Sequence, residues 1–328
     1  MSNPPAVVTA VVPTRNRLDL LKVTLARIFA QRDVGLRVIV VNEASSDGTA
    51  DYLRRLAACD KRLAVIHHQQ PRGLPAARNA GLALVETEWV AFCDDDDLWA
   101  PDKVSSQISA IAEAPGARWS CTGSVSVRHD LTISGCQRPP RSGDISEELL
   151  IYNAVPGGGS SLLAETSLLL DLNGYDESLT SCEDWALNAE LAHASPIASV
   201  DRPLVGYRVW TGTMSTDVQR MRAGREKVLD RWAGSRSPAL HRQSERMSDQ
   251  YLGRLHIRNG ARIRGSSHYL QYAVRSRRPR LLRTAMGMLL APSVVAARHD
   301  LQDSQGVPDD WRREASDWLG EEPPEFAC

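Results

Sequence analysis

Aromatic side chains are scarce in this 328-residue chain, in which Phe, Trp and Tyr together make up 5% of the residues. Long apolar runs are missing as well, because the most apolar late stretch, residues 281–297, is interrupted by Arg283 and Pro292. That stretch is too short and too broken for a membrane-spanning helix. Residues 1–5 carry no basic region followed by an apolar one, so we expect no signal peptide and a cytoplasmic location.

Cysteine pairs and an excess of positive charge are also missing. The six cysteines form no CxxC pair, so neither a zinc ribbon nor a disulfide framework is expected. There are 39 Lys and Arg against 40 Asp and Glu, a formal net charge of −1, which argues against a protein that mainly binds nucleic acid. The signatures GxxxxGK[ST], HExxH and GxSxG are absent, and no GxGxxG follows the first apolar run. P-loop, zincin, α/β-hydrolase and nicotinamide chemistry are therefore disfavoured.

The first hundred residues do contain a regular alternation of strand-like and helix-like segments. Short β-branched runs at residues 6–12, 37–41, 63–66 and 89–93 predict buried strands, with helical spacing of apolar side chains between them. Because parallel strands need such long crossovers, we expect an α/β protein with a doubly wound, mostly parallel sheet and helices on both faces. Ligands of these sheets bind beyond the carboxyl ends of the strands, where residues 14–16, 42–43 and 94–97 lie.

Four consecutive carboxylates, Asp94 to Asp97, directly follow the fourth strand. At about 4 Å and an effective dielectric of about 20, each neighbouring pair repels by about 4 kcal/mol. A divalent cation would relieve this repulsion, and oxygen ligands suit Mg²⁺ or Mn²⁺, which commonly bridge to a substrate phosphate. The alternative is a solvated acidic turn that caps the next helix. We favour the metal site, because the buried strand fixes where the run lies.

A second acidic pair, Glu183 and Asp184, opens an amphipathic segment. Taken alone, such a pair is a common helix cap that interacts favourably with the helix dipole. A carboxylate beside a metal–phosphate site can also act as general base towards an attacking hydroxyl. Between the two acidic sites, the three glycines at residues 157–159 predict a flexible loop.

Six segments occur in an order that resembles the family 2 inverting glycosyltransferases. They are residues 11–17 (VVPTRNR), 40–49 (VVNEASSDGT), 72–81 (RGLPAARNAG), 92–101 (FCDDDDLWAP), 173–187 with NGYDE and EDWAL, and 206–208 (GYR). Each motif alone is weak, but six in this order are specific, and the resemblance covers about residues 6–215. It implies a GT-A fold over residues 1–215, with a nucleotide-binding half at 1–101 and an acceptor half at 102–215.

The resemblance also implies roles for individual residues. Pro13, Thr14 and Asn16 are expected to line the nucleoside pocket, and Asn42 and Glu43 to approach base and ribose. Arg72 and Arg78 are expected to lie on the segment that frames the nucleotide, with a structural role as the alternative for Arg78. Asp94 and Asp96 form the DxD metal site, Asp95 contacts ribose or donor sugar, and Asp184, with Glu183 beside it, is the catalytic base. A sugar would then pass with inversion from a nucleotide-diphosphate donor to the hydroxyl of a glycan, lipid-linked sugar or small molecule, with Mn²⁺ or Mg²⁺ at the diphosphate.

Two positions depart from the family pattern. Asn42-Glu43 stands where relatives usually have two aspartates, and Trp210 stands where many have a histidine. An amide offers both a donor and an acceptor, which leaves guanine, thymine and uracil open as the donor base. Trp210 would either stack on a sugar or base or pack in the core.

Two other functions stay open. A sugar nucleotidyltransferase would also use a parallel sheet and an Asp-bound metal, but residues 13–17 lack the glycine-rich phosphate loop that it typically needs. A catalytically silent nucleotide-sugar-binding or scaffold protein would fit the departures at Asn42-Glu43 and Trp210. The intact Asp94, Asp96 and Asp184 argue against that interpretation.

Beyond residue 215, arginines recur among helix formers, which predicts a helical extension over residues 216–328 with a basic face. The acidic, proline-containing residues 321–325 predict a disordered tail. The basic face is either a solvated surface or a peripheral contact with an anionic membrane, at the inner face of the cell membrane, or with an acidic lipid-linked acceptor.

Overall fold

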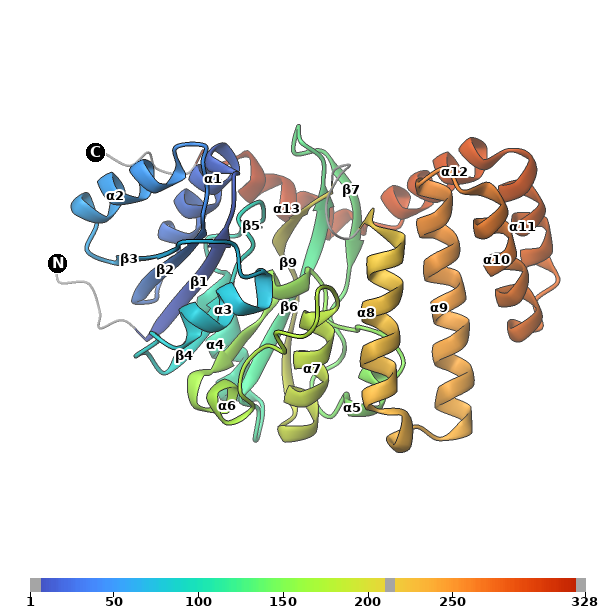
Figure 1. Cartoon of the computed structure of the whole chain (residues 1–328), viewed down its shortest axis with the longest axis horizontal. Helices are drawn as coiled ribbons and strands as arrows, with labels where there is room; N and C mark the ends of the chain where they lie inside the picture. The colour runs from blue at the N-terminus through green and yellow to red at the C-terminus, as the bar shows by residue number, and fades with distance from the viewer. Residues whose placement is uncertain (1–6, 210–215, 323–328) are drawn as a thin grey trace.

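A computed structural model describes residues 7–209 and 216–322 of the chain (Figure 1). Four parallel strands begin the fold: β1 (Val8–Thr14), β2 (Leu36–Glu43), β3 (Leu63–His68) and β4 (Trp89–Phe92). The helices between them are α1 (Leu18–Phe29), α2 (Thr49–Cys59) and α3 (Leu74–Leu82). The strand–helix alternation predicted for this part of the chain is confirmed, and every residue of β1 is buried, as its β-branched run requires.

The remaining strands extend the sheet and make it mixed. They are β5 (Leu98–Trp99), β6 (Trp119–Val127), β7 (Ile133–Gln137), β8 (Leu163–Glu165) and β9 (Ile197–Arg208). The sheet order is β3-β2-β1-β4-β8-β6-β9-β5, with β7 paired to β6. Because β8 runs antiparallel to β4, the direction changes there, close to the acidic residues that follow β4.

Helices α4 (Lys103–Glu113), α5 (Ser146–Leu149), α6 (Thr166–Asp171) and α7 (Glu183–Ala194) cover this second part of the sheet. The three glycines predicted to form a loop lead instead into a short 3₁₀ turn, η1 (Gly158–Ser161). Gly157 and Gly158 have φ of 66° and 55°, in the left-handed region that favours glycine. The backbone therefore makes a tight turn that packs against β4, β6 and β9 rather than a free loop.

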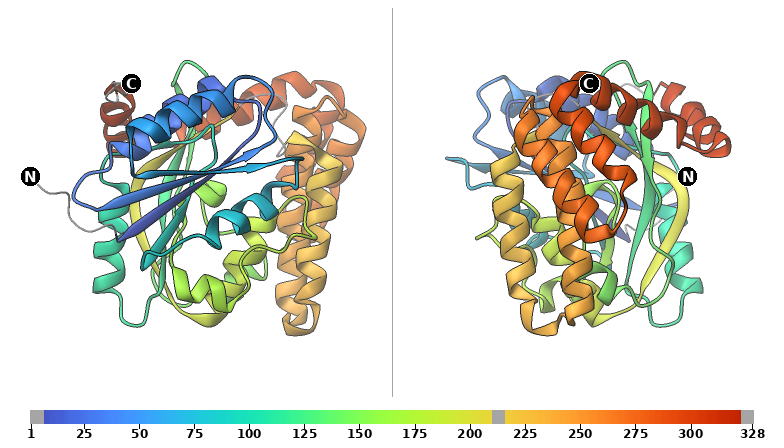
Figure 2. Two further views of the ribbon diagram at one scale, coloured as in Figure 1. Left: turned by 60° about the vertical axis from the view of Figure 1, so that its left-hand side comes forward. Right: turned by 90° about the vertical axis from the view of Figure 1, so that its right-hand side faces the viewer.

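The last third of the chain is helical, as expected. Its helices are α8 (Val218–Arg231), η3 (Ala233–Ser235), α9 (Pro238–Arg258), α10 (Arg262–Ser276), α11 (Arg280–Leu290), α12 (Pro292–Gln305) and α13 (Asp309–Gly320). Helices α8 to α11 stand side by side at one end of the molecule (Figure 1), and Figure 2 shows them from two further sides. Trp210 lies outside the described residues. So do residues 323–328, which include most of the expected tail.

Helix α13 returns to the sheet instead of remaining with the other C-terminal helices. Trp311 and Trp318 are buried against residues of β6 and β9. The Arg27 guanidinium, on α1, donates to the carbonyls of Trp318 at 2.5 Å and Leu319 at 3.0 Å. A domain boundary at residue 215 stays a prediction, and any such boundary must place α13 with the sheet.

Two further findings concern the helices and the cysteines of the chain. Across residues 7–209 and 216–322, no helix combines the length and the apolar character needed to cross a bilayer. The five cysteines within the same residues, Cys59, Cys93, Cys121, Cys136 and Cys182, are free thiols.

Candidate functional site

The acidic run after β4 lies against the end of β1. The carboxylate of Asp95 is buried and accepts hydrogen bonds from Thr14 Oγ1 at 2.8 Å and from the Arg15 backbone N–H at 3.3 Å. Arg17 Nη1 lies 2.9 Å from Asp95 Oδ1 and 3.0 Å from Asp96 Oδ2. Burial raises the pKa of Asp95 to about 6, although Arg17 acts to lower it. One guanidinium therefore offsets much of the repulsion between two adjacent carboxylates.

Asp97 connects the same run to the second part of the sheet. Its buried carboxylate accepts from Ser160 Oγ at 2.5 Å and from the Arg208 backbone N–H at 3.1 Å. Burial, with the charges of Asp96 and Asp94, raises the pKa of Asp97 well above its ordinary value. This aspartate therefore fixes η1 and the end of β9 around the site, a role that the sequence analysis did not assign to it.

Arg78, on α3, joins the two acidic motifs. Its guanidinium is fully buried, with Nη2 2.5 Å from Asp94 Oδ1 and Nη1 2.9 Å from Glu183 Oε1. Burial disfavours the charged form, yet the neighbouring acids, Asp94 foremost, raise the pKa of Arg78 well above its ordinary value. A Cβ at Gly159 would lie 2.9 Å from Arg78 Nη2, so only glycine leaves room for this guanidinium. The DxD segment and the acidic pair of α7, 89 residues apart from Asp94 to Glu183, thus belong to one site.

Asp184 lies beside this bridge in the first turn of α7. Asn153 Nδ2 donates to Asp184 Oδ2 at 3.0 Å, which fixes the orientation of the carboxylate. Burial, and then the charge of Glu183, raises the pKa of Asp184 to about 6, while Arg78 lowers it. Asp184 and Asp94 are both partly accessible, whereas Glu183, Asp95 and Asp97 are buried. Asp94 and Asp184 are therefore the most accessible of these carboxylates.

The residues expected around the nucleoside hold neighbouring loops together. The buried Glu43 carboxylate accepts from the backbone N–H groups of Arg72 and Gly73, both at 2.7 Å, and contacts His68. Asn42 Oδ1 accepts from the Ser45 N–H at 3.1 Å. The segments that follow β2 and β3 thus converge at the carboxyl ends of the strands.

The other residues expected at the nucleoside differ in exposure. Pro13 is buried within β1, and Asn16 is exposed, where its Oδ1 accepts from the Ser46 N–H at 2.7 Å. The Arg72 side chain is half exposed and lies 4.0 Å from Glu177 Oε2. The contacts of these side chains with a nucleotide stay predictions.

A divalent cation is compatible with the donor atoms at this place. Asp94 and Asp96 offer hard carboxylate oxygens, the ligand type of Mg²⁺ and Mn²⁺. Across the part of the chain that the structure describes, no group of three or more His, Cys, Asp or Glu side chains is arranged to hold a metal ion. The residues therefore fit an ion held by one or two protein carboxylates and completed by a phosphate and water. The guanidinium of Arg17 contacts the Asp96 carboxylate at 3.0 Å.

Sequence reasoning missed several residues of this site. Three of them, Arg17, Asp97 and Arg208, lie inside the identified motifs, so the sequence did indicate that they are near the site. No sequence signal identified Asn153 or Ser160, because the sequence does not indicate which polar side chain of an irregular segment faces a distant carboxylate.

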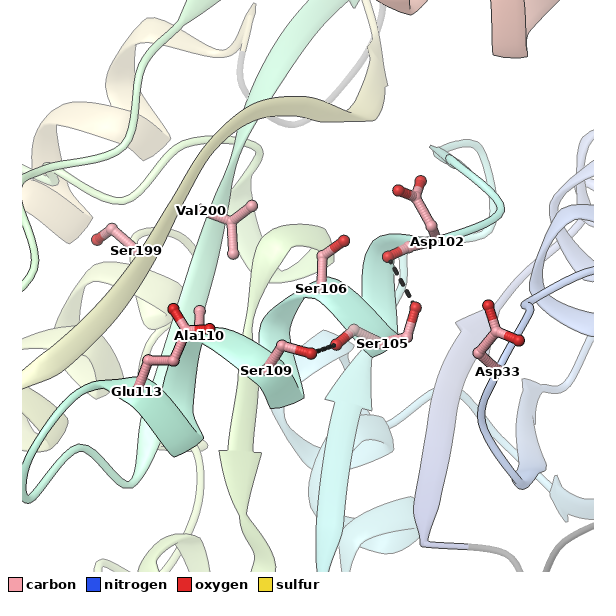
Figure 3. A pocket seen from close by; sticks show the side chains of 9 residues that line it. All are labelled: Asp33, Asp102, Ser105, Ser106, Ser109, Ala110, Glu113, Ser199 and Val200. Atoms are coloured by element: carbon pink, nitrogen blue, oxygen red, sulfur yellow. Dashed lines mark hydrogen bonds between the residues drawn. The ribbon is translucent and has the colours of Figure 1, made fainter.

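The hollow drawn in Figure 3 is a separate feature. It measures about 580 Å³ and lies along α4 and the start of β9. Its lining is Asp33, Asp102, Ser105, Ser106, Ser109, Ala110, Glu113, Ser199 and Val200. None of the residues discussed for the site lines it, so it carries no part of the candidate chemistry.

Comparison with known proteins identifies similar sequences and folds. Residues 9–130 match the family described as glycosyl transferase family 2. A putative teichuronic acid biosynthesis glycosyltransferase, TuaG of Bacillus subtilis, is 31% identical over 34% of this chain and 45% of its own length. The UDP-Glc:alpha-D-GlcNAc-diphosphoundecaprenol beta-1,3-glucosyltransferase WfaP of Escherichia coli is 28% identical over 31% and 40%. The chain thus spans less than half the length of these relatives.

Solved structures share the fold over nearly the whole chain. TarS 1-349 of S. aureus in complex with UDP-GlcNAc has a TM-score of 0.57 and 15% identity, covering 96% of this chain and 92% of that one. The mannosyltransferase PcManGT of Pyrobaculum calidifontis, in complex with GDP-Man and Mn2+, has a TM-score of 0.55 and 20% identity, covering 96% and 85%. Residues 9–130 therefore resemble glycosyl transferase family 2, and the fold of the chain is that of the GT-A glycosyltransferases.

Proposed function

We propose that this protein transfers a sugar, with inversion, from a nucleotide-diphosphate sugar to a hydroxyl group of an acceptor. The observation that carries the proposal is the Arg78 bridge, because it brings Asp94 of the donor-side motif and the Glu183–Asp184 pair into one site. A direct displacement needs both an activated leaving group and a base on the acceptor, and holding the two reactants in line supplies much of the rate.

In this proposal Asp184 removes the proton from the acceptor hydroxyl as that oxygen attacks the anomeric carbon. Its pKa of about 6 leaves it ionised at neutral pH and still close enough to the working pH to be an effective base. Asn153 holds the carboxylate in orientation, and Glu183 acts through Arg78 rather than on the substrate.

The donor would lie at the carboxyl ends of β1, β2 and β4. Asp95 contacts ribose or donor sugar, the segments at residues 13–16, 42–43 and 72–78 surround the nucleoside, and Asp94 and Asp96 hold a divalent cation. When bound, Mg²⁺ or Mn²⁺ neutralises charge that develops on the departing diphosphate. Arg17, which contacts Asp96, is placed to exchange its carboxylate partner for phosphate as the donor enters.

The names of relatives support an acceptor of the cell-surface glycan class. They include proteins of teichuronic acid and succinoglycan biosynthesis and an enzyme whose printed acceptor is a diphosphoundecaprenol-linked sugar. We therefore propose a glycan or lipid-linked sugar as acceptor in the synthesis of a surface polysaccharide or glycolipid. The base of the donor stays open, since TarS was solved with UDP-GlcNAc and PcManGT with GDP-Man.

Calorimetric titration of UDP, dTDP, GDP and CDP, each with and without Mn²⁺, tests the donor site. We expect one nucleotide to bind only with the metal and Asp96→Asn to weaken that binding at least tenfold. Asp184→Asn should bind the nucleotide normally while release of nucleotide from the matching sugar donor falls by about 10²- to 10⁴-fold. Asp230→Asn, an exposed change on α8, should alter neither.

The alternatives predict other outcomes. A silent scaffold protein would bind a nucleotide sugar without turnover in the wild type, and failure of all four nucleotides to bind would contradict the donor site altogether. A sugar nucleotidyltransferase would consume a nucleoside triphosphate and a sugar phosphate, and a separate assay with these two substrates would detect it as diphosphate release.

A further inference from the structure

The C-terminal helices contain a long segment without negative charge. Residues 250–299 include ten arginines and no Asp, Glu or Lys, in a chain whose overall formal net charge is −1. Three of these arginines are paired inside the helical region: Arg254 with Asp303, Arg258 with Asp300 and Arg275 with Glu245. Six exposed ones on and around α10 and α11 form no ion pair with any carboxylate of residues 7–209 or 216–322: Arg262, Arg264, Arg277, Arg278, Arg280 and Arg283.

Apolar side chains are exposed on the same two helices. Ile263 and Leu290 are 70% and 74% exposed, against a core in which most leucines are nearly inaccessible. The exposed set comprises Ile263, Leu270 and Val274 on α10 and Leu282, Met286 and Leu290 on α11. The α10 residues are spaced i, i+7, i+11 and the α11 residues i, i+4, i+8, so each set forms one stripe along its helix.

The two stripes lie on one face of the helix pair. Helices α10 and α11 are linked by three residues, 277–279, and pack side by side, so they run antiparallel (Figure 1). They meet through Tyr269 and Ala273 on α10 and Ala285 and Met288 on α11, which are buried. At about 100° per residue, each stripe lies about a quarter turn from its buried contact. Because the helices are antiparallel, these quarter turns carry both stripes to the same side.

The arginines surround this face. Arg277, Arg278 and Arg280 lie at the turn that joins the helices, Arg262 and Arg264 lie at the opposite end of α10, and Arg283 follows Leu282 on α11. An apolar strip with a basic border is the pattern of a surface that inserts side chains between lipid headgroups while its cations contact anionic lipid. In the right panel of Figure 2 the two helices face outward, away from the sheet.

We propose that this outer face of α10 and α11 docks the protein peripherally on an anionic lipid bilayer. A second copy of the chain fits the face less well, because a symmetric contact would bring the six unpaired arginines against six others without a compensating acid. A bilayer that contains anionic lipid supplies both the apolar layer and the negative charge that the face lacks. The proposal is independent of the catalytic one, since it uses no residue of the site.

Cosedimentation of the full chain with vesicles tests the docking surface. We expect binding to phosphatidylcholine vesicles that contain about one third phosphatidylglycerol, at least tenfold stronger than to pure phosphatidylcholine, and weakened by 0.5 M salt. The variant Leu282→Gln/Met286→Gln/Leu290→Gln and the variant Arg277→Gln/Arg278→Gln/Arg280→Gln should each reduce the partition coefficient at least tenfold. The matched charge control Arg37→Gln/Arg54→Gln/Arg55→Gln, on β2 and α2, should retain most of the binding.

A second measurement guards against misfolded variants. Hydrogen exchange of the wild type should slow within α10 and α11 when anionic vesicles are added and stay unchanged in α2. Equal binding to neutral and anionic vesicles, or equal loss in the α2 control, would overturn the proposal. So would a wild-type dimer, seen by sedimentation velocity, that the α11 variant dissociates.

Discussion

A single guanidinium, that of Arg78, forms an ion pair with one carboxylate from each of the two acidic motifs. It is 1% exposed and lies within 2.9 Å of both Asp94 and Glu183. Removal of one partner from a buried ion pair typically costs about 3–5 kcal/mol, because the remaining charge is left buried and unpaired. Arg78 therefore contributes to the stability of the fold as well as to the shape of the site.

Replacement of this residue should show the effect directly. We expect Arg78→Met to lower the free energy of unfolding by about 3 kcal/mol or more, measured by urea denaturation at pH 7. Arg37→Met is the matched control: its ion pair with Glu86 is largely exposed, and such pairs contribute about 0.2–1 kcal/mol. Similar losses in the two variants would contradict the assigned role of Arg78.

The pKa of Asp184 sets a pH dependence for the proposed reaction. A base must be deprotonated to act, and burial raises the pKa of Asp184 to about 6, so the rate should be constant at neutral pH and fall below about pH 6. The fall should approach tenfold per pH unit in kcat/KM. Because Arg78 lowers this pKa, Arg78→Met should move the fall to higher pH. A profile that is flat from pH 5 to 8 would exclude Asp184 as the base.

The sequence indicated the carboxylates of this site more readily than their partners. The run from Asp94 to Asp97 follows a strand, and the pair Glu183–Asp184 opens a helix. Both positions could therefore be predicted from the local pattern. The resemblance placed Arg78 on the segment that frames the nucleotide. It did not predict that Arg78 is buried between the two acidic motifs. Which distant acids a buried cation contacts depends on how α3, β4 and α7 pack, and no local pattern encodes that packing.

At the scale of elements, strand length decided what could be predicted. The first four strands have four to eight residues and carry β-branched runs, so periodicity identified them. Strands β5 and β8 have two and three residues. Their existence depends on pairing with β9, β4 and β6, which are far away in the sequence. Such short segments have too few residues to show a period.

The contact between α3 and β1 depends on a glycine. A Cβ at Gly81 would overlap the side chain of Val11 in the centre of β1. We expect Gly81→Ala to cost about 1–3 kcal/mol of unfolding free energy, the usual range for overpacking a well-packed core. Gly234→Ala is the control, since nothing lies within 4 Å of its added Cβ, and it should change stability by less than about 0.5 kcal/mol. Equal urea midpoints for both variants would refute the tight packing.

For the whole molecule, helix α13 connects the C-terminal region to strand β9 of the sheet, alongside the contact of α12 with β7. Trp318 is 5% exposed and its indole N–H donates to the Pro203 carbonyl at 3.0 Å. We expect Trp318→Ala to lower the free energy of unfolding by about 3–5 kcal/mol, as for other buried aromatic truncations. The neighbouring exposed Asp317→Ala should have little effect. A Trp318→Ala protein as stable as the Asp317→Ala protein would show that α13 is not part of the core.

The helical character of the C-terminal region could be predicted from its composition. The packing of α13 against the sheet could not. Its signal was present, since Trp311, Ala315, Trp318 and Leu319 recur at i, i+4, i+7 and i+8 and predict a buried face. The surface against which that face packs is formed by β6 and β9, and nothing local in the sequence of α13 specifies it. Pattern therefore predicts which face of a helix is covered more reliably than what covers it.

The bond between Arg27 and α13 also has a consequence for how the protein is made. Arg27 reaches its carbonyl partners 291 and 292 residues later in the chain. On the ribosome, synthesis at about 5–20 residues per second separates the two by roughly 15 to 60 seconds. Throughout that interval the first helix carries a cation whose native partners do not yet exist. The sheet can begin to fold early, but its outer side near α1 is completed only after residue 319 has left the ribosome.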